Sequence, residues 1–234
     1  FKSNYKILFK NIMALRLLPF RQYSEQDVIN LFASNTADAS PSTNGAGSAG
    51  VFVKVSAGNL DSDPITYATN GYLGKTDYPF VGAAQYPEVP LKFTTATAGE
   101  PVLGITLNQT LQEDENGEKL LYNPVKAAEL QAVLSGQACP VATRGVFTLS
   151  DDAVDWADSS MTPNSHLVVS SNAGKVSGLL ASNAGPFTGD HTIVGRILGT
   201  GQRVSSNGQS DQFAGTTTGK YALVQIDCVN PTSL

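Results

Sequence analysis

The sequence predicts an all-β protein with small helices only, in which two related β units form a barrel- or sandwich-like body behind an extended N-terminal arm. Two observations favour this class. Short apolar segments separated by Gly, Pro and Asn turns recur from residue 51 onward, which is the pattern of successive strands. Charged residues make up only 15% of the 234 residues, below the roughly 25% of an ordinary soluble domain. We therefore divide the chain into residues 1–50, an arm with a short helix and a linker, and residues 51–234, the β-rich body.

The predicted arm covers residues 1–23 and is basic and apolar at once. Residues 1–21 contain five of the 15 basic residues and none of the 20 acidic ones. Such a segment docks on an acidic protein surface or on nucleic acid phosphates. Its apolar content favours the protein partner over nucleic acid. The partner-binding residues that we expect in the arm are Phe1, Tyr5, Ile7, Leu8, Phe9, Leu15, Arg16, Leu17, Leu18, Phe20 and Arg21.

A short helix and a linker follow the arm. Residues 24–27 (SEQD) resemble a capping box, and the expected helix carries Val28, Ile29, Leu31 and Phe32. Residues 33–50 are rich in small residues and read as a linker. The linker contains a literal G-x-G-x-x-G at residues 45–50. A dinucleotide site needs a strand before this motif and a helix after it, and neither is expected here.

Strands and turns alternate through the body. Tight turns are expected at residues 70–71 and 172–174, where Asn and Gly occur together. One helix interrupts the strands over residues 124–135, because Asn123 can cap it, Pro124 suits its first position and Gly136 follows it. The strands that we expect lie at residues 51–55, 65–69, 89–94, 101–107, 139–149, 166–170, 192–198 and 221–229.

A weak internal echo suggests that the two β units are related. Residues 102–107 (VLGITL) and 193–198 (IVGRIL) are both apolar strands with a glycine near the centre. A glycine in that position marks a bulge, a sharp bend or the close approach of another backbone. A chance likeness between two short β segments is the alternative.

The search for catalytic chemistry returns no candidate site. His166 opens an apolar strand, and His191 lies in a Gly-rich turn beside Asp190, whereas catalytic partners usually converge from separate segments. Cys139 and Cys228 have no metal-binding spacing, and two reduced thiols are favoured over a disulfide. We expect no catalytic residue, no metal site and no cofactor, and hence no enzyme. No apolar run reaches the length of a transmembrane helix.

Two acidic segments remain open to interpretation. Residues 113–118 (EDENGE) lack the ligand spacing of an EF-hand and are read as a solvated hairpin tip rather than a calcium site. Asp151, Asp152, Asp155 and Asp158 surround Trp156. Trp156 is therefore either an exposed contact residue or a side chain that folds back onto the core, and the sequence favours neither.

The order of motifs in the body resembles that of capsid decoration (head cement) proteins of tailed bacteriophages, of the β-barrel or β-tulip type. The segments that carry the resemblance are PVLGITLNQT at 101–110, QACPVATRGVFTLS at 137–150, SHLVVSSNAGKVSG at 165–178, TIVGRILGTG at 192–201 and YALVQIDC at 221–228. The resemblance covers roughly residues 50–229, and the quoted segments lie between residues 101 and 228.

The resemblance implies a structural role in the virion, on the outer surface of the capsid. Such a protein has the major capsid protein as its partner, assembles as a homotrimer and bridges neighbouring capsomers without catalytic residues or a membrane. Two alternatives stay open. One is another β-rich virion component, such as a tail-tube or head–tail joining protein. The other is an extracellular carbohydrate-binding module that uses Trp156.

Overall fold

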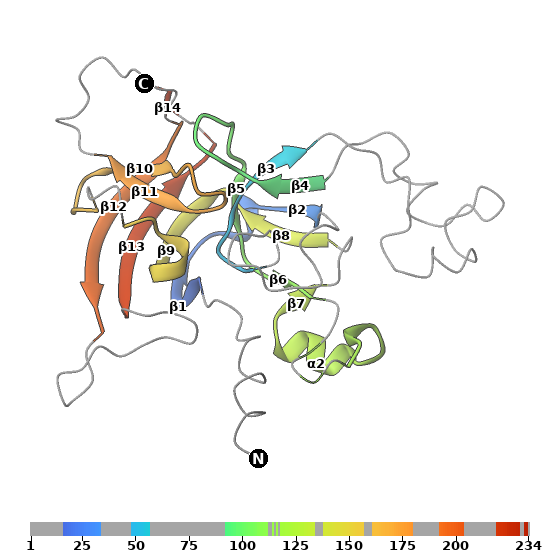
Figure 1. Cartoon of the computed structure of the whole chain (residues 1–234). Helices are drawn as coiled ribbons and strands as arrows, with labels where there is room; N and C mark the ends of the chain where they lie inside the picture. The colour runs from blue at the N-terminus through green and yellow to red at the C-terminus, as the bar shows by residue number, and fades with distance from the viewer. Residues whose placement is uncertain are drawn as a thin grey trace.

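The computed structural model describes residues 16–33, 48–56, 92–111, 114, 116, 118–133, 138–156, 161–179, 192–203, 219–229 and 232–233. Their secondary structure is mostly β, in two sheets, with one short α-helix, α2 (Pro124–Glu129) (Figure 1). The predicted all-β class is therefore confirmed. The strand expected at residues 65–69, the turn at 70–71 and the larger part of the linker, 34–47, lie outside the described residues.

The first sheet follows the order β1-β9-β13-β12-β10-β11, and the short β14 also pairs with β12. All of its named pairs are antiparallel. Along β13, Ala222, Val224 and Ile226 are fully buried and alternate with partly exposed residues, as expected for one face on a core. The strands are β1 (Leu17–Gln22), β9 (Arg144–Ser150), β10 (His166–Val169), β11 (Val176–Leu179), β12 (Thr192–Gln202), β13 (Lys220–Asp227) and β14 (Thr232–Ser233).

The second sheet curls into a barrel-like shape in the order β2-β4-β3-β5-β8, and β8 pairs again with β2. Its β2–β4 seam is parallel and consists of only two residue pairs, whereas the other pairs are antiparallel. The strands are β2 (Val28–Ala33), β3 (Phe52–Ser56), β4 (Lys92–Thr95), β5 (Gly104–Thr106) and β8 (Ala138–Ala142). A small separate pair joins β6 (Gln109–Thr110) to β7 (Ala132–Val133).

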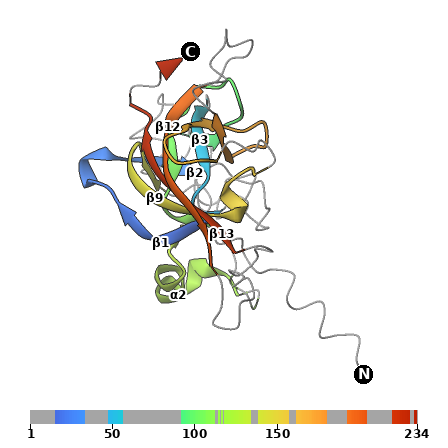
Figure 2. The same cartoon turned by 90° about the vertical axis from the view of Figure 1, so that its left-hand side faces the viewer.

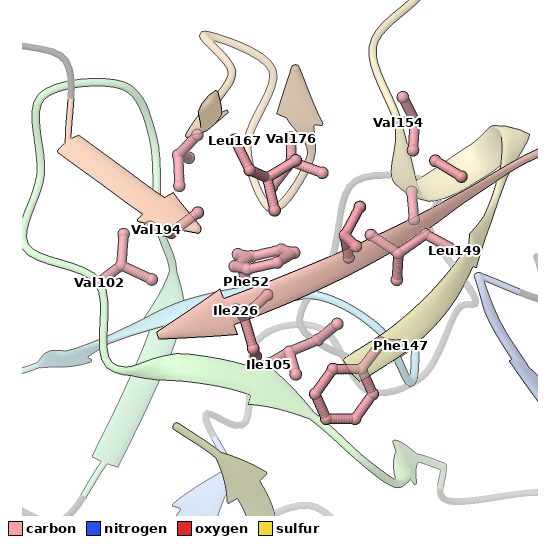
Figure 3. Close-up of a cluster of buried hydrophobic side chains, with 14 of the residues drawn as sticks. Phe52, Val102, Ile105, Phe147, Leu149, Val154, Leu167, Val176, Val194 and Ile226 are labelled. Atoms are coloured by element: carbon pink, nitrogen blue, oxygen red, sulfur yellow. The ribbon is translucent and has the colours of Figure 1, made fainter. Parts of the chain in front are cut away.

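One hydrophobic core joins the two sheets (Figure 3). Phe52 and Ile105 of the barrel-like sheet pack in the same cluster as Phe147, Leu167 and Ile226 of the first sheet, and all five are fully buried. Burying one side chain of this size stabilises the fold by about 1.5–3 kcal/mol. A smaller cluster fills the barrel-like sheet itself and includes Leu31, Val51, Val53, Phe93, Cys139 and Val141.

The glycines of the internal echo lie in matching environments, one in each sheet. A Cβ on Gly104 would lie 2.1 Å from the carbonyl oxygen of Ala142 in β8, and one on Gly195 would lie 2.0 Å from that of Gln225 in β13. Both glycines therefore permit the close approach of the neighbouring backbone, one of the roles predicted for them.

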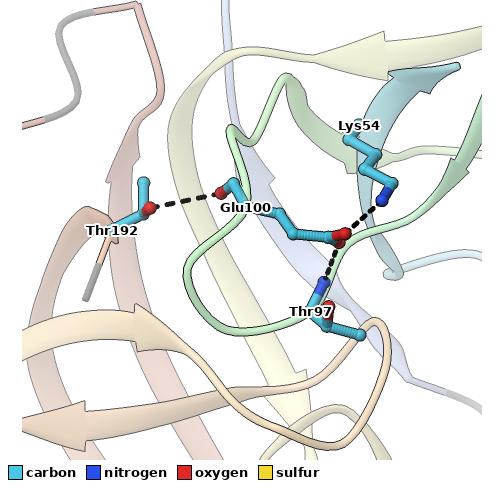
Figure 4. Close-up of polar contacts among 4 residues, drawn as sticks. All are labelled: Lys54, Thr97, Glu100 and Thr192. Carbon is cyan, nitrogen blue, oxygen red and sulfur yellow. Dashed lines mark hydrogen bonds and ion pairs between the residues drawn. The ribbon is translucent and has the colours of Figure 1, made fainter. Parts of the chain in front are cut away.

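A polar contact ties the loop before β5 to both sheets (Figure 4). The Glu100 carboxylate pairs with Lys54 of β3 and accepts a hydrogen bond from the Thr97 backbone N–H at 2.8 Å, while its carbonyl oxygen accepts one from the Thr192 hydroxyl at 3.2 Å. These contacts lower the pKa of Glu100 to about 2, first through the Lys54 hydrogen bond. Thr192 belongs to β12, so the loop bridges the two sheets.

The helix expected at residues 24–32 is wrong beyond its first turn. The Ser24 hydroxyl accepts a hydrogen bond from Gln26 N at 3.3 Å, but only a 3-10 turn, η2 (Glu25–Asp27), follows it. The chain then forms β2, which pairs with β8 over five residues. β-branched Val28 and Ile29 suit that ladder, so long-range pairing overrides the local capping signal. The body consequently begins before residue 51.

Two further element boundaries differ from prediction. Asn123 caps α2 by accepting from Lys126 N at 3.3 Å, as predicted, but the helix ends at Glu129 instead of continuing to 135. Gln131 takes a left-handed φ of 49°, and β7 follows.

The single strand expected at 139–149 is two strands, separated at Thr143, whose N–H donates to the Asp27 carbonyl at 2.8 Å. The turn at 172–174 is confirmed, with Gly174 at φ 72°.

Candidate contact surface and cleft

The structure divides the predicted arm residues into three groups. Phe1, Tyr5, Ile7, Leu8, Phe9 and Leu15 lie outside the described residues. Arg16, Leu17 and Leu18 are buried within the chain, which is not the exposed position expected of partner-binding residues. The reason is that residues 17–22 form β1, which pairs with β9 and brings Leu17 into the main core. Phe20 and Arg21 stay at the surface, with Phe20 54% exposed.

Arg16 is an anchor inside the body rather than a contact residue. It is 1% exposed, and none of its three guanidinium nitrogens has a hydrogen-bond partner in the part of the chain that the structure describes. Burial lowers its pKa from 12.5 to about 10, and the charge of Asp152 opposes that change. Burial also disfavours the charged form of Asp152: it raises the pKa of the Asp152 carboxyl group, and the charge of Arg16 opposes this shift. Sequence reasoning placed Asp152 in an acidic loop and missed this coupling to the arm.

β1 presents the more open edge of the first sheet. At the other end of the strand order, the edge of β11 is met by a parallel bridge from Val154 to Val176, and Asp155 N–H donates to the Val176 carbonyl at 2.7 Å. Among the described residues, no strand pairs with the outer edge of β1. Pro19 lacks a backbone N–H and is exposed, which suits an edge strand. Phe20 follows it as an exposed aromatic residue.

A second set of exposed apolar side chains lies around α2. Tyr122 ends the 3-10 turn η5 (Leu120–Tyr122) and is 73% exposed, and Val125 on α2 is 68% exposed. Figures 1 and 2 both place α2 and β1 at the same end of the molecule. Phe20 and Tyr23 at and after β1, and Tyr122 and Val125 at and before α2, are exposed apolar residues of these two regions. Exposed apolar side chains mark an interaction surface where they form a contiguous patch.

A cleft of about 390 Å³ opens beside the strand β1. The hydroxyphenyl ring of Tyr23 stacks on Phe147, with ring centroids 5.9 Å apart and planes 14° apart. Arg21 Nη2 donates to Gln131 Oε1 at 3.2 Å, which joins the end of β1 to the turn after α2. Polar or aromatic side chains from three stretches of the chain line the cleft, namely Arg21, Tyr23, Glu25, Asn30, Asn108 and Gln131.

The other residues singled out from the sequence do not form a site. Trp156 packs against the main core, and Lys220 Nζ lies 5.2 Å from its ring centroid, which favours the folded-back interpretation. Cys139 and Cys228 are buried and unpaired, as predicted, and burial raises the pKa of each thiol to about 12. His166 is half-buried at the start of β10, whereas His191 lies outside the described residues.

The described part of the chain holds no group of three or more His, Cys, Asp or Glu residues placed to bind a metal ion. At the acidic segment, Asp114 Oδ1 accepts hydrogen bonds from the N–H groups of Asn116 and Glu118, both at 2.8 Å, so this carboxylate closes a turn. None of the helices described has the length and apolarity needed to cross a membrane.

Comparisons with known proteins do not assign the chain to a family. No protein-family model matches the sequence, and no curated protein or solved structure gives a significant match. The functional proposal therefore rests on the residues and contacts described above and on the resemblance of the strand motifs.

Proposed function

We propose that this protein is a bacteriophage capsid decoration protein that binds the outer surface of the shell and bridges neighbouring capsomers. The observation that carries the proposal is the position of β1. This strand continues directly from the basic, apolar residues 1–15, and it forms a sheet edge that no described strand covers, with Phe20 exposed. A leader that enters an open edge strand supplies two adjoining means of attachment to another protein.

Strand addition and side-chain packing both act at such an edge. An extended segment of the partner can hydrogen-bond to the free backbone groups of an edge strand. Pro19 has no backbone N–H, so this strand offers one hydrogen-bond donor fewer than a strand without proline. Binding at this edge therefore depends more on side-chain contacts. Phe20 then supplies apolar area of the kind that dominates binding hot spots.

Assembly as a homotrimer multiplies these contacts. Each subunit of a trimer presents its own β1 edge and leader to the major capsid protein. Once one subunit is bound, the next contact is intramolecular, so individually weak contacts add to a durable attachment. A protein that locks a shell needs this kind of slow release more than it needs strong single contacts.

The charge distribution supports a protein partner with acidic character at the leader's docking position. Residues 1–15 carry three basic residues and no acidic one, while the whole chain has a net charge of −5. Salt at physiological ionic strength screens the attraction between exposed charges that lie more than about 8–10 Å apart. Attachment is expected to weaken, without vanishing, as salt rises, because the apolar contacts persist.

Co-sedimentation of the full chain with expanded shells that lack it tests the proposal. Phe20→Ser is expected to weaken shell binding about tenfold, because it removes an exposed aromatic contact at the β1 edge. Val55→Ser is the matched control, since Val55 is 50% exposed against 54% for Phe20 but belongs to the barrel-like sheet. Equal binding by Phe20→Ser and wild type would contradict the role of the edge.

Copy number in purified particles separates a shell protein from a tail or neck protein. A decoration protein is present in numbers proportional to the capsomers, and cryo-electron microscopy places it on the outside of the shell. A small number of copies confined to the tail or the head–tail junction would overturn the proposal.

A further inference from the structure

We propose that the cleft beside β1 is a binding site for a neutral saccharide of one or two sugar rings. This inference goes beyond shell attachment and does not depend on it. The cleft volume of about 390 Å³ lies within the roughly 300–1,000 Å³ of small-molecule sites. Its chemistry, rather than its size, identifies the ligand class.

The first requirement of a sugar site is an aromatic platform held in a fixed orientation, and Tyr23 provides one. One face of its ring stacks on Phe147, which is fully buried and cannot turn away. Tyr23 is still 41% exposed and lines the cleft. The face of an aromatic ring is electron-rich, and the C–H groups on one side of a pyranose ring pack against such a face.

The second requirement is a set of side chains that both donate and accept hydrogen bonds, as sugar hydroxyls do. The side-chain amides of Asn30 and Asn108 line the cleft and hydrogen-bond to no residue that the structure describes. Each amide offers two N–H donors and a carbonyl acceptor, which matches a pair of adjacent hydroxyl groups. Glu25 adds an acceptor with no partner among the described residues.

Arg21 and Gln131 form a third, pre-organised part of the wall. Their mutual hydrogen bond at 3.2 Å holds both side chains while leaving guanidinium N–H groups of Arg21 unused. Gln131 keeps its left-handed backbone because its N–H donates to Ala128 O at 3.0 Å and its carbonyl accepts from Gln109 N at 3.2 Å. Strained non-glycine residues held by their surroundings in this way are concentrated at binding sites.

The charge balance of the cleft favours a neutral ligand. Arg21 and Glu25 are the charged side chains that line it, and they have opposite signs. A simple anion is attracted by Arg21 and repelled by Glu25, and a simple cation meets the reverse. A purely apolar ligand would cover the amides of Asn30 and Asn108 without hydrogen-bonding to them, which is costly. A polyol satisfies all of these groups at once.

Saturation-transfer-difference NMR on the full chain tests the inference with a panel of glucose, galactose, mannose, N-acetylglucosamine and maltose. At least one sugar is expected to receive saturation from wild type. Tyr23→Ala and Asn108→Ala are each expected to raise its Kd about tenfold or more. Asn108→Ala guards against misfolding, because the Asn108 side chain lies outside both hydrophobic clusters and hydrogen-bonds to no residue that the structure describes. Tyr122→Ala is the control, since Tyr122 is 73% exposed and does not line the cleft.

Three results would overturn the inference. The first is the absence of saturation transfer to every sugar in the panel. The second is a sugar signal that Tyr23→Ala and Asn108→Ala leave unchanged. The third is tighter binding of glutamine, a zwitterion whose carboxylate and ammonium groups match Arg21 and Glu25, than of any sugar. None of these outcomes bears on shell attachment, which is measured by co-sedimentation of variants at a different residue.

Discussion

Replacing Arg16 by methionine is expected to stabilise the protein, although Arg16 is buried beside an acidic residue. The guanidinium group has no hydrogen-bond partner among the residues that the structure describes, and its pKa is about 10 in place of 12.5. Each tenfold change in proton affinity corresponds to about 1.4 kcal/mol, so the charge costs the folded state about 3 kcal/mol at neutral pH. Methionine keeps much of the apolar stem and removes the charge. We expect a gain of about 1–3 kcal/mol, because the shorter side chain fills the space less completely.

The sign of the change distinguishes two physical pictures. If Arg16 and Asp152 formed a strong buried pair, removing one partner would leave the other charge uncompensated and cost about 3–5 kcal/mol. Burial is the larger influence on the pKa of both groups, and it disfavours the charged form of each. The net effect of carrying these two charges is therefore unfavourable.

The pH dependence of the gain follows from Asp152. A carboxyl group whose folded-state pKa is raised contributes stability below its unfolded pKa, and this stability is lost as pH rises through the folded value. Without Arg16 to oppose the shift, the pKa of Asp152 rises further. The gain in the free energy of unfolding of Arg16→Met relative to wild type is therefore expected to be larger near pH 5 than near pH 8.

Urea unfolding followed by the fluorescence of Trp156, the single tryptophan, measures this prediction. Arg144→Met is the control, because Arg144 forms an exposed pair with Asp227 at 3.2 Å. Exposed pairs contribute about 0–1 kcal/mol, so the control should change little. A loss of about 3 kcal/mol or more for Arg16→Met would refute the reasoning and establish a stabilising buried pair.

The remaining predictions concern strand packing, the inter-sheet loop and the thiols. Gly104→Ala is expected to cost about 3 kcal/mol by thermal unfolding, because its Cβ meets a backbone oxygen at 2.1 Å, whereas Gly199→Ala, with nothing within 4 Å, should cost under about 1 kcal/mol. Glu100→Gln should lower stability at pH 7 but not at pH 2, because a carboxylate with a pKa of about 2 contributes stability above the usual 4.5 that is lost on acidification. Cys139 and Cys228, with thiol pKa values of about 12, should react with a thiol reagent at pH 8 only after urea unfolding, and rapid labelling of the native protein would contradict their burial.

Most strands could be read from the sequence, because alternation and turn residues are local signals. The alternating residues of β13 and the turn ending at Gly174 are examples. The expected helix after Ser24 failed because its cap is local, whereas the pairing of Val28 with Ala142 is not. The burial of Arg16 depends likewise on a strand more than a hundred residues away. The sequence therefore predicted a basic and apolar arm, but it did not predict that Arg16 and Leu17 would be buried in the body.

The cleft was beyond sequence reasoning for the same reason. Arg21 and Gln131 are separated by 110 residues and meet only when β1 and the turn after α2 are in place. Asn108 begins a formal N-x-T glycosylation motif at residues 108–110, which does not indicate that its side chain lines a cleft. Amide and aromatic side chains become a recognisable site only when their directions converge, and one sequence carries no signal of that convergence.

The β2–β4 seam makes one end of the barrel-like sheet a natural attachment point for foreign peptides. β2 ends at Ala33, β3 ends at Ser56 and β4 begins at Lys92, and the backbone pairs Ser56–Lys92 and Ala33–Phe93 bring these strand ends together. A segment inserted between Ser56 and Lys92 leaves every described ladder intact. For a flexible loop, each doubling of length costs only about 0.6 kcal/mol of closure entropy. Antigens or enzymes inserted between Ser56 and Lys92 are expected to lower the free energy of unfolding only slightly.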